Sequence, residues 1–306
     1  MEVEILCDAD IDRIPIMVFM DAISDYVIAD FEGRAVSPPR QTVGFPAGRI
    51  AFTTGGLGHV AGFRVYESFN SISRAGEDQI VAVWDTTTCS LEGVCLGSRL
   101  GAIRTGALGG IAFAALTPPS ISRCALIGTG LQAETQLLAV LARRQLAEVR
   151  VYSRNRARRD AFVERMQAVA GSTCIAAFDS AEAAAEGVEA VVLATNSETP
   201  VIDPAALEQV DHIATVGPKF RDAHELPLPA VTGRLIVSDS PQQIRAQGQR
   251  HMLFAHPGQG EVRHLGEILS KGRPPVLHRS LYLSAGLSGT EVIALHAALT
   301  YRSNHV

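Results

Sequence analysis

A short apolar run, a glycine-rich turn and a helical pattern follow one another in the middle of this chain. Residues 124–127 (CALI) are apolar and long enough for one buried strand. Gly128 and Gly130 break this run, and residues 131–144 (LQAETQLLAVLARR) carry apolar side chains at helical spacing. With Ala133, the turn matches a G-x-G-x-x-A motif between a strand and a helix. This context predicts a dinucleotide-binding turn, with an ordinary strand-to-helix turn as the alternative.

The residue types in this turn suit a pyrophosphate. Gly128 permits a tight turn, and Gly130 allows backbone N–H groups to approach the phosphates. Ala133 takes the place of a third glycine and lets the helix pack close to the sheet. The N-terminus of the helix adds partial positive charge. We therefore expect the cofactor to contact Gly128, Thr129, Gly130, Leu131 and Gln132.

The residues after the next predicted strand bear on the choice between the two nicotinamide cofactors. An acidic side chain about 20 residues past the glycines binds the ribose 2′-hydroxyl of NAD. Here residues 148–152 (EVRVY) lead instead into Ser153, Arg154 and Asn155. A hydroxyl, a guanidinium and an amide suit a 2′-phosphate, which favours NADP(H), with NAD(H) as the alternative. The arginines that follow are expected to form a solvated helix start, namely Arg156, Arg158 and Arg159.

Composition and charge exclude several classes of protein. The 306 residues are 47% hydrophobic and 19% charged, as in ordinary globular proteins of one or two domains. The net charge of -5 indicates neither a nucleic acid nor a membrane as partner, and no apolar run reaches about 18 residues. The first ten residues (MEVEILCDAD) lack the basic region of a signal peptide. The five cysteines make no C-x-x-C, so we expect reduced, mostly buried thiols in a cytoplasmic protein.

The segments on either side of the turn predict two kinds of domain. Before it, residues 10–31 are expected to form one amphipathic helix and residues 41–97 a meander of antiparallel strands. After residue 118, short strands alternate with helices, which predicts an α/β fold with a Rossmann-type, doubly wound parallel sheet. Residues 288–291 (SGTE) are expected to form a capping box that opens a final helix.

One apolar helix precedes the strand–turn–helix unit. Residues 100–116 (LGAIRTGALGGIAFAAL) carry a single charged side chain, Arg104. Four glycines would cost an exposed helix about 1 kcal/mol each relative to alanine, so we expect this helix to pack tightly against a neighbour or a ligand. Arg104 must reach an anion or solvent, because a buried unpaired charge is very costly.

Six short motifs follow one another along the chain. They are PPR at 38–40, AIRTGA at 102–107, LIGTGLQA at 126–133, VYSRN at 151–155, LATNS at 193–197 and LSAGLSGTEV at 283–292. In this order they resemble the ornithine cyclodeaminase/mu-crystallin family. The resemblance implies an NAD(P)-dependent homodimer that exchanges hydride between nicotinamide and the carbon of an amino acid or its imine. It also implies a substrate-binding and dimerisation domain, made of residues 1–117 and 285–306, and an NAD(P)-binding domain of residues 118–284.

The resemblance further implies roles for residues at matching positions. Arg104 resembles the arginine that holds the substrate carboxylate, and Arg40 stands where a second substrate-side arginine is usual. The positions that would line the nicotinamide and its ribose are Thr195, Asn196, Ser284 and Gly286.

Three positions depart from the family pattern. Arg64 stands where the family carries a lysine close to the reacting carbon. It is expected to bind a carboxylate or act in catalysis, with an ion pair to Glu67 or another acid as an equal alternative. Lys219 stands where true cyclodeaminases carry an aspartate. It is expected to supply a proton or bind an acidic substrate, with a surface lysine as the alternative. Gly101 stands where a threonine is frequent.

Together these features predict an NAD(P)H-dependent imine reductase or, in reverse, an amino-acid dehydrogenase. The substrate would be an α-imino or α-amino acid, and several arginines around one small site suggest more than one carboxylate. Two alternatives stay open. One is an ornithine cyclodeaminase, which the missing aspartate disfavours, and the other is a non-catalytic NADPH-binding protein. No metal site is expected, because the candidate histidines fit no zinc template and should lie at the surface, namely His251, His256, His264 and His278.

Overall fold

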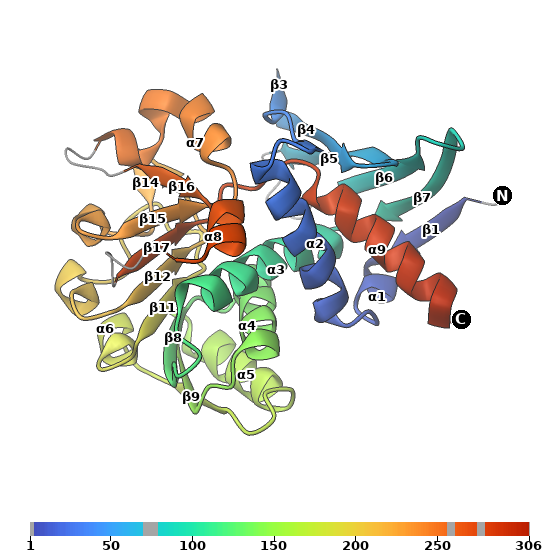
Figure 1. The fold of residues 1–306 in the computed structure, drawn as a ribbon. Helices are drawn as coiled ribbons and strands as arrows, with labels where there is room; N and C mark the ends of the chain where they lie inside the picture. Colours follow the sequence, from blue (N-terminus) through green and yellow to red (C-terminus); the bar gives the residue numbers. More distant parts are fainter. Residues whose placement is uncertain (1–2, 70–78, 256–260, 274–278, 306) are drawn as a thin grey trace. The chain divides into compact units, whose positions relative to one another are not determined.

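The computed structural model describes residues 3–69, 79–255, 261–273 and 279–305 (Figure 1). The chain divides into two compact units. Unit 1 comprises Met1–Ala107 and Gly286–Val306, and unit 2 comprises Leu108–Ala285. The chain thus passes from unit 1 to unit 2 inside helix α3 (Arg99–Leu116). Two of the histidines considered as metal ligands, His256 and His278, lie outside the described residues.

Unit 1 is built on a seven-stranded mixed sheet. Its strands lie in the order β1-β7-β6-β5-β4-β2, with β3 paired to β4. The antiparallel meander predicted by the sequence consists of β3 (Gln41–Phe45), β4 (Gly48–Leu57), β5 (Val60–Phe69), β6 (Gln79–Asp85) and β7 (Ser90–Leu96). At the edges, β1 (Glu4–Cys7) pairs parallel to β7, and β2 (Ala35–Val36) pairs antiparallel to β4.

The C-terminal helix α9 (Thr290–His305) covers one face of this sheet (Figure 1). Glycines on the strands allow the helix to approach closely. A Cβ atom on Gly62 would lie 3.0 Å from Val292 Cγ1, and one on Gly93 would lie 2.8 Å from Leu299 Cδ1. The last residues of the chain therefore complete the core of a unit that its first residues began, as predicted.

The structure divides the helix predicted over residues 10–31. Helix α1 (Asp8–Ile11) ends before Pro15, and helix α2 (Ile16–Phe31) begins after it. Proline has no N–H to donate, and it disfavours helical backbone at the preceding residue. The apolar periodicity continues across this break, so periodicity alone did not reveal it.

Unit 2 is built on an eight-stranded parallel sheet, which confirms the predicted fold class. The strands lie in the order β10-β9-β8-β11-β12-β17-β15-β16. They are β8 (Arg123–Ile127), β9 (Glu148–Tyr152), β10 (Cys174–Ala177), β11 (Ala190–Leu193), β12 (His212–Thr215), β15 (Leu235–Ser238), β16 (Val262–His264) and β17 (Ser280–Leu283). Neighbouring residues of one strand, such as Ala125 and Leu126, are both buried, as expected when helices cover both faces of a parallel sheet.

The helices of unit 2 connect and cover these strands. Helix α4 (Leu131–Arg143) contacts β8, and α5 (Arg156–Gln167) contacts β9 and β10. Helix α6 (Ala181–Ala185) joins a core cluster with one face of the sheet, including Val191 and Ile213.

Helix α3 packs closely against α4 within unit 2, as its glycines predict. A Cβ atom on Gly109 would lie 1.7 Å from Gln136 Oε1, and one on Gly110 would lie 2.5 Å from Ala139 Cβ. Neither position has room for a larger residue. The glycines lower the helix propensity, but they permit the contact between the two helices.

The strand order of unit 2 reverses at β8. The chain proceeds from β8 outward to β9 and β10, and then returns to place β11 on the other side of β8. In open α/β sheets, ligands bind beyond the carboxyl ends of the strands at such a reversal. Helix α4 begins at this point, immediately after the glycine turn that follows β8.

The cysteines only partly follow the expectation. All five are free, and Cys95 and Cys124 are buried, but Cys7, Cys89 and Cys174 are exposed. The expectation of mostly buried thiols is therefore wrong. In the part of the chain that the structure describes, no helix combines the length and the apolar character needed to cross a bilayer.

Candidate functional site

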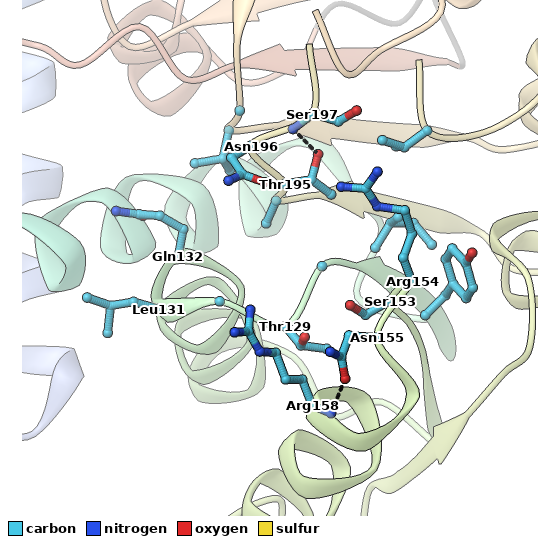
Figure 2. Close-up of a pocket in the computed structure, with 18 of the residues that line it drawn as sticks. Thr129, Leu131, Gln132, Ser153, Arg154, Asn155, Arg158, Thr195, Asn196 and Ser197 are labelled. Atoms are coloured by element: carbon cyan, nitrogen blue, oxygen red, sulfur yellow. Dashed lines mark hydrogen bonds between the residues drawn. The ribbon is translucent and has the colours of Figure 1, made fainter. Parts of the chain in front are cut away.

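A cavity of about 670 Å³ lies at the carboxyl ends of β8, β9 and β11 (Figure 2). This volume is typical of small-molecule sites. The predicted cofactor residues among its walls are Gly128, Thr129, Gly130, Leu131, Gln132, Ser153, Arg154, Asn155, Thr195 and Asn196. Two other predicted cofactor residues are not among these walls and stay predictions, namely Ser284, which follows β17, and Gly286, which is part of unit 1.

The glycine turn after β8 has the backbone that a bound phosphate needs. Gly128 has a φ of +120°, which L side chains rarely adopt, and a Cβ atom there would lie 2.2 Å from the carbonyl oxygen of Ala194. Gly130 is the N-cap of α4, and a Cβ atom there would meet nothing within 4 Å. The open space beside the first turn of α4 therefore faces backbone N–H groups and the positive end of the helix dipole. These features fit the pyrophosphate of a dinucleotide.

The turn after β9 presents polar side chains to the cavity. Ser153, Arg154 and Asn155 line it, and the side chain of Arg158 joins them (Figure 2). Asn155 caps α5, since its Oδ1 accepts a hydrogen bond from the backbone N–H of Arg158 at 3.0 Å. This cap brings the first turn of α5 to the rim of the cavity. Sequence analysis missed Arg158, although its place three residues after a capping asparagine is a readable signal.

The expectation of a solvated basic helix start holds for Arg156 and Arg158, which are exposed, and is wrong for Arg159. Arg158 lines the cavity. Arg159 is buried, and its Nη1 lies 2.9 Å from Asp179 Oδ1. Arg156 remains exposed, at 82% of its side-chain surface.

A buried carboxylate holds the loops that follow β11 and β12. Glu225 Oε2 accepts hydrogen bonds from the backbone N–H and the hydroxyl of Thr195, both at 2.7 Å. Its Oε1 accepts from the hydroxyl of Thr215 at 2.7 Å and from the backbone N–H groups of Val216 at 3.1 Å and Gly217 at 2.6 Å. Thr195, Val216 and Gly217 line the cavity, so Glu225 positions one of its walls. Sequence analysis missed this residue, because only the fold brings its five donors together.

Lys219 lies on β13 (Lys219–Phe220), which pairs antiparallel with β14 (Ala223–His224), the strand immediately before Glu225. It is only 8% exposed, and its Nζ donates a hydrogen bond to the carbonyl oxygen of Gly217 at 2.7 Å. Burial lowers the pKa of Lys219 to about 8, and the negative charges of Glu225 and Asp239 limit this fall. The alternative of a surface lysine is therefore wrong.

In unit 1, two buried arginines share one buried carboxylate. Arg64 on β5 and Arg104 on α3 are 5% and 7% exposed, and Glu291 on α9 is 1% exposed. Glu291 Oε1 lies 2.8 Å from Arg64 Nη1 and 2.7 Å from Arg104 Nε. The first contact is an aligned hydrogen bond, whereas the second is an ion pair without hydrogen-bond alignment. Burial raises the pKa of Glu291, but Arg104 and Arg64 outweigh it and hold that pKa below its usual value.

Arg104 and Arg40 converge on one glycine. A Cβ atom built on Gly286 would lie 2.9 Å from Arg40 Nη2, and 3.5 Å and 3.6 Å from Nη1 and Nη2 of Arg104. Gly286 also has a φ of +85°, so both its backbone and its surroundings disfavour a side chain. Two guanidinium groups at one point form a site suited to a carboxylate.

The model of the ornithine cyclodeaminase/mu-crystallin family matches residues 9–299. The chain belongs to this family. It is 30% identical over 282 residues to the NAD(P)H-dependent anabolic L-arginine dehydrogenase of Pseudomonas aeruginosa, covering 87% of this chain and 86% of the relative. The matches to two other curated relatives cover 58% of their length.

Solved structures of similar fold cover nearly the whole chain. Δ1-pyrroline-2-carboxylate reductase of Thermococcus litoralis, in complex with NADH and L-proline, has a TM-score of 0.85 at 24% identity, covering 99% of this chain and 98% of the other. An archaeal alanine dehydrogenase dimer with bound NAD has a TM-score of 0.83 at 22% identity, covering 100% and 98%. At this identity the likeness shows the fold.

Two positions that sequence analysis expected to depart from the family pattern, Arg64 and Gly101, lie side by side in the structure. Arg64 Nε donates to Gln79 Oε1 at 2.9 Å, and the guanidinium carbon of Arg64 lies 4.0 Å from the centre of the Tyr66 ring. A Cβ atom on Gly101 would lie 2.6 Å from that Gln79 oxygen and 3.2 Å from Arg64 Nη2. The guanidinium and its amide partner thus fill the space that a side chain at position 101 would need.

The acid that pairs with Arg64 is Glu291 rather than Glu67. This also corrects the capping box predicted at residues 288–291. Helix α9 begins at Thr290, so Glu291 is its second residue and not its third. Its carboxylate lies with the two arginines rather than at the backbone of Ser288.

The histidines in the described residues have local roles. His251 is buried, which corrects its expected surface position, and its Nδ1 accepts a hydrogen bond from the backbone N–H of Leu253 at 3.2 Å. Burial, with a smaller effect of Lys219, lowers the pKa of His251 to about 4. His264 caps α8 (Leu265–Lys271) by accepting from Gly266 N. Among the described residues, no group of three His, Cys, Asp or Glu side chains could hold a metal ion.

Proposed function

We propose that this protein is an NAD(P)H-dependent reductase of an α-imino acid, or in reverse an amino-acid dehydrogenase. The observation that carries this proposal is the pair of guanidinium groups, from Arg104 and Arg40, that converge on Gly286 in unit 1. A carboxylate is the matching ligand, and an α-imino acid places its C=N carbon next to that carboxylate. Membership of a family with dehydrogenase and reductase relatives supports the proposal.

The cavity of unit 2 would hold the cofactor, which supplies a hydride when bound. The turn at Gly130 would hold the pyrophosphate, and Thr195 and Asn196 would line the ribose next to the nicotinamide. Ser153 and Arg154 would bind the 2′-phosphate, so we propose NADP(H) over NAD(H).

The cofactor preference is tested by replacing Arg154 with alanine. The loss of a charge-assisted hydrogen bond is expected to raise the Kd of NADPH about 10- to 100-fold and to leave the Kd of NADH nearly unchanged. Fluorescence titration measures both constants. Arg156→Ala is the control, because this exposed arginine lies only two residues further on, at the first position of α5, and should affect neither cofactor. Equal losses for NADPH and NADH would contradict the preference.

We also propose that Lys219 supplies the proton that imine reduction takes up together with the hydride. Its Nζ hydrogen-bonds to Gly217, a residue of the cavity wall, and burial lowers its pKa from 10.5 to about 8. Such a group can give up a proton near neutral pH, which an exposed lysine does less readily.

The pH dependence follows from this pKa. The rate of reduction is expected to fall as the pH rises through about 8, because protonated Lys219 is lost. The stability of the fold should change in the opposite sense. Between about pH 8 and 10.5 the unfolded chain binds more protons at this lysine, so stability rises with pH.

Lys219→Met should abolish the fall in kcat/KM for imine reduction that is expected as the pH rises through about 8. Lys219→Arg should move this fall to a pH too high to measure, since the pKa of arginine exceeds about 12. If kcat/KM of Lys219→Met fell with pH as it does in the wild type, the lysine would be excluded as the proton donor.

Turnover tests the proposed function itself. NADPH and NADH oxidation at 340 nm is measured with pyruvate, 2-oxobutyrate, glyoxylate or oxaloacetate plus ammonia or methylamine, and with pyrroline and piperideine carboxylates. We expect oxidation with at least one of them. Ammonia release from ornithine without net NADH would indicate a cyclodeaminase instead. Tight NADPH binding without any turnover would indicate a non-catalytic binding protein.

We further propose a homodimer, formed through the face of the unit 1 sheet opposite α9. Phe52, Val65, Ile80 and Leu96 form one cross-strand row, and Phe52, Ile80 and Leu96 are exposed. An exposed apolar row of this kind marks an interaction surface. Light scattering that gave the mass of a single chain would contradict this proposal.

A cytoplasmic location of the protein stays a prediction.

A further inference from the structure

One carboxylate of the protein itself lies among the arginines proposed to bind substrate. Arg40, Arg64 and Arg104 bring three positive charges, and the buried Glu291 brings one negative charge. Among these four residues positive charges outnumber the negative one, so charge alone does not limit the substrate to one carboxylate. The positions of the donor atoms restrict the number of carboxylates.

Two of the N–H donors of Arg64 are directed at the protein. Its Nε donates to Gln79 at 2.9 Å and its Nη1 to Glu291 at 2.8 Å, while its plane lies over the Tyr66 ring. Gln79 and Arg64 also fill the space beside Gly101, which leaves the guanidinium no room to turn toward that side.

The nitrogen atoms of Arg104 lie near two different groups. Nε lies 2.7 Å from Glu291, whereas Nη1 and Nη2 lie near Gly286, where Arg40 Nη2 also lies. One carboxylate at Gly286 would therefore accept hydrogen bonds from Nη1 and Nη2 of Arg104 and from Nη2 of Arg40. A second carboxylate between Arg104 and Arg64 would meet the carboxylate of Glu291, which already occupies that position.

We infer that Glu291 determines substrate specificity, by occupying the place that a second substrate carboxylate would take between Arg64 and Arg104. The substrate then carries a single carboxylate at this cluster. This inference rests on the proposed function, and it replaces the expectation of a dicarboxylic substrate that the number of arginines suggested. Glu291 touches no reacting atom, and it acts through the two arginines.

The wild-type protein provides the first test. 2-Oxobutyrate and oxaloacetate have the same number of carbon atoms and differ by a terminal carboxylate, so their imines with ammonia form a matched pair. We expect kcat/KM for NADPH oxidation to be at least about 10-fold higher with 2-oxobutyrate, because like charges at close range repel strongly in a buried site. A preference for oxaloacetate would overturn the inference and leave the proposed function standing.

Binding is measured in parallel, so that the two proposals fail separately. Butyrate and succinate are unreactive analogues, and each should raise the melting temperature according to its affinity. A chain that reduces no imine contradicts the proposed function. The inference is then decided by the melting temperatures, since a larger rise with succinate than with butyrate would overturn it.

Glu291→Ala provides the second test. The vacated position between Arg64 and Arg104 should accept the second carboxylate of oxaloacetate. The ratio of kcat/KM with oxaloacetate to kcat/KM with 2-oxobutyrate should therefore rise at least about 10-fold. Glu4→Ala is the matched control, because Glu4 also pairs with an arginine of unit 1, Arg302, at 2.7 Å. This control should leave the ratio unchanged. An unchanged ratio in Glu291→Ala would overturn the inference.

Loss of Glu291 leaves two buried arginines without their partner, and this can prevent folding. In that case succinate, added during refolding, should restore a cooperative melting transition better than butyrate does. The double variant Arg64→Met/Glu291→Gln removes both charges together. It should fold and keep the wild-type preference for 2-oxobutyrate, because Arg64 is no longer present to receive a second carboxylate. Equal rescue by the two acids, or a preference for oxaloacetate in the double variant, would overturn the inference.

Discussion

Replacing Arg104 with alanine is expected to lower kcat/KM for imine reduction about 100- to 1,000-fold, or about 3 to 4 kcal/mol. The side chain is buried, and its two Nη atoms lie at Gly286, where we propose that the substrate carboxylate binds. Without it, the carboxylate keeps only the donor of Arg40, and the imine carbon is no longer held in one orientation. Steady-state kinetics at varied imine concentration measure the loss. The affinity for NADPH should not change, because its proposed contacts belong to unit 2.

One further variant separates the paired Nη donors of Arg104 from its charge, and another serves as a control. Arg104→Lys keeps the charge but loses the two parallel donors, so it should recover only part of the activity. Arg99→Ala removes an arginine from the start of the same helix, where it pairs with Asp12, and it should behave like the wild type. If Arg104→Ala retained wild-type kcat/KM while remaining folded, the proposed carboxylate site would be wrong.

Replacing Glu225 with alanine is expected to destabilise the protein by about 4 kcal/mol, and to weaken NADPH binding in the fraction that folds. The carboxylate accepts five hydrogen bonds, three of them from backbone N–H groups of the cavity wall. Buried N–H groups without an acceptor carry most of this cost. Urea denaturation measures the stability, and fluorescence titration measures the affinity.

Glu225→Gln provides the matched comparison. It keeps the shape and one carbonyl oxygen, but its NH₂ group would face donors, so we expect an intermediate loss of stability. Glu208→Ala removes an exposed acid of the same unit and should change the free energy of unfolding by less than about 0.5 kcal/mol. Wild-type stability in Glu225→Ala would show that water or a shift of the loop replaces the carboxylate.

Local patterns in the sequence predicted much of the fold. The strand, turn and helix around Gly128 follow from an apolar run, two glycines and a helical period, all within about 20 residues. The meander of unit 1 follows in the same way from period-two strands with short connections. Alternation along β5 also placed Arg64 on the face of Gly62 and Tyr66, and Gly62 meets α9 on that face.

The polar interior could not be predicted in the same way. A surface position stayed open as an alternative for Lys219, because nothing near it in the sequence reveals that it is buried. Pro15 divides a helix whose apolar period continues on both sides. Arg158 and Arg159 are adjacent and basic, yet one lines the cavity and the other pairs with Asp179.

The sequence by itself determined where a dinucleotide cavity would form and which arginines were candidates for a carboxylate. The cavity depends on a short motif whose backbone geometry is local, and the arginines were identified through the resemblance of short motifs to a known family. Only the tertiary structure showed that Glu291 lies between Arg64 and Arg104, and that Glu225 holds the cavity wall. Arg64 and Glu291 are 227 positions apart. They meet because the last helix of the chain packs on a sheet formed by its first residues, and no local pattern encodes that contact.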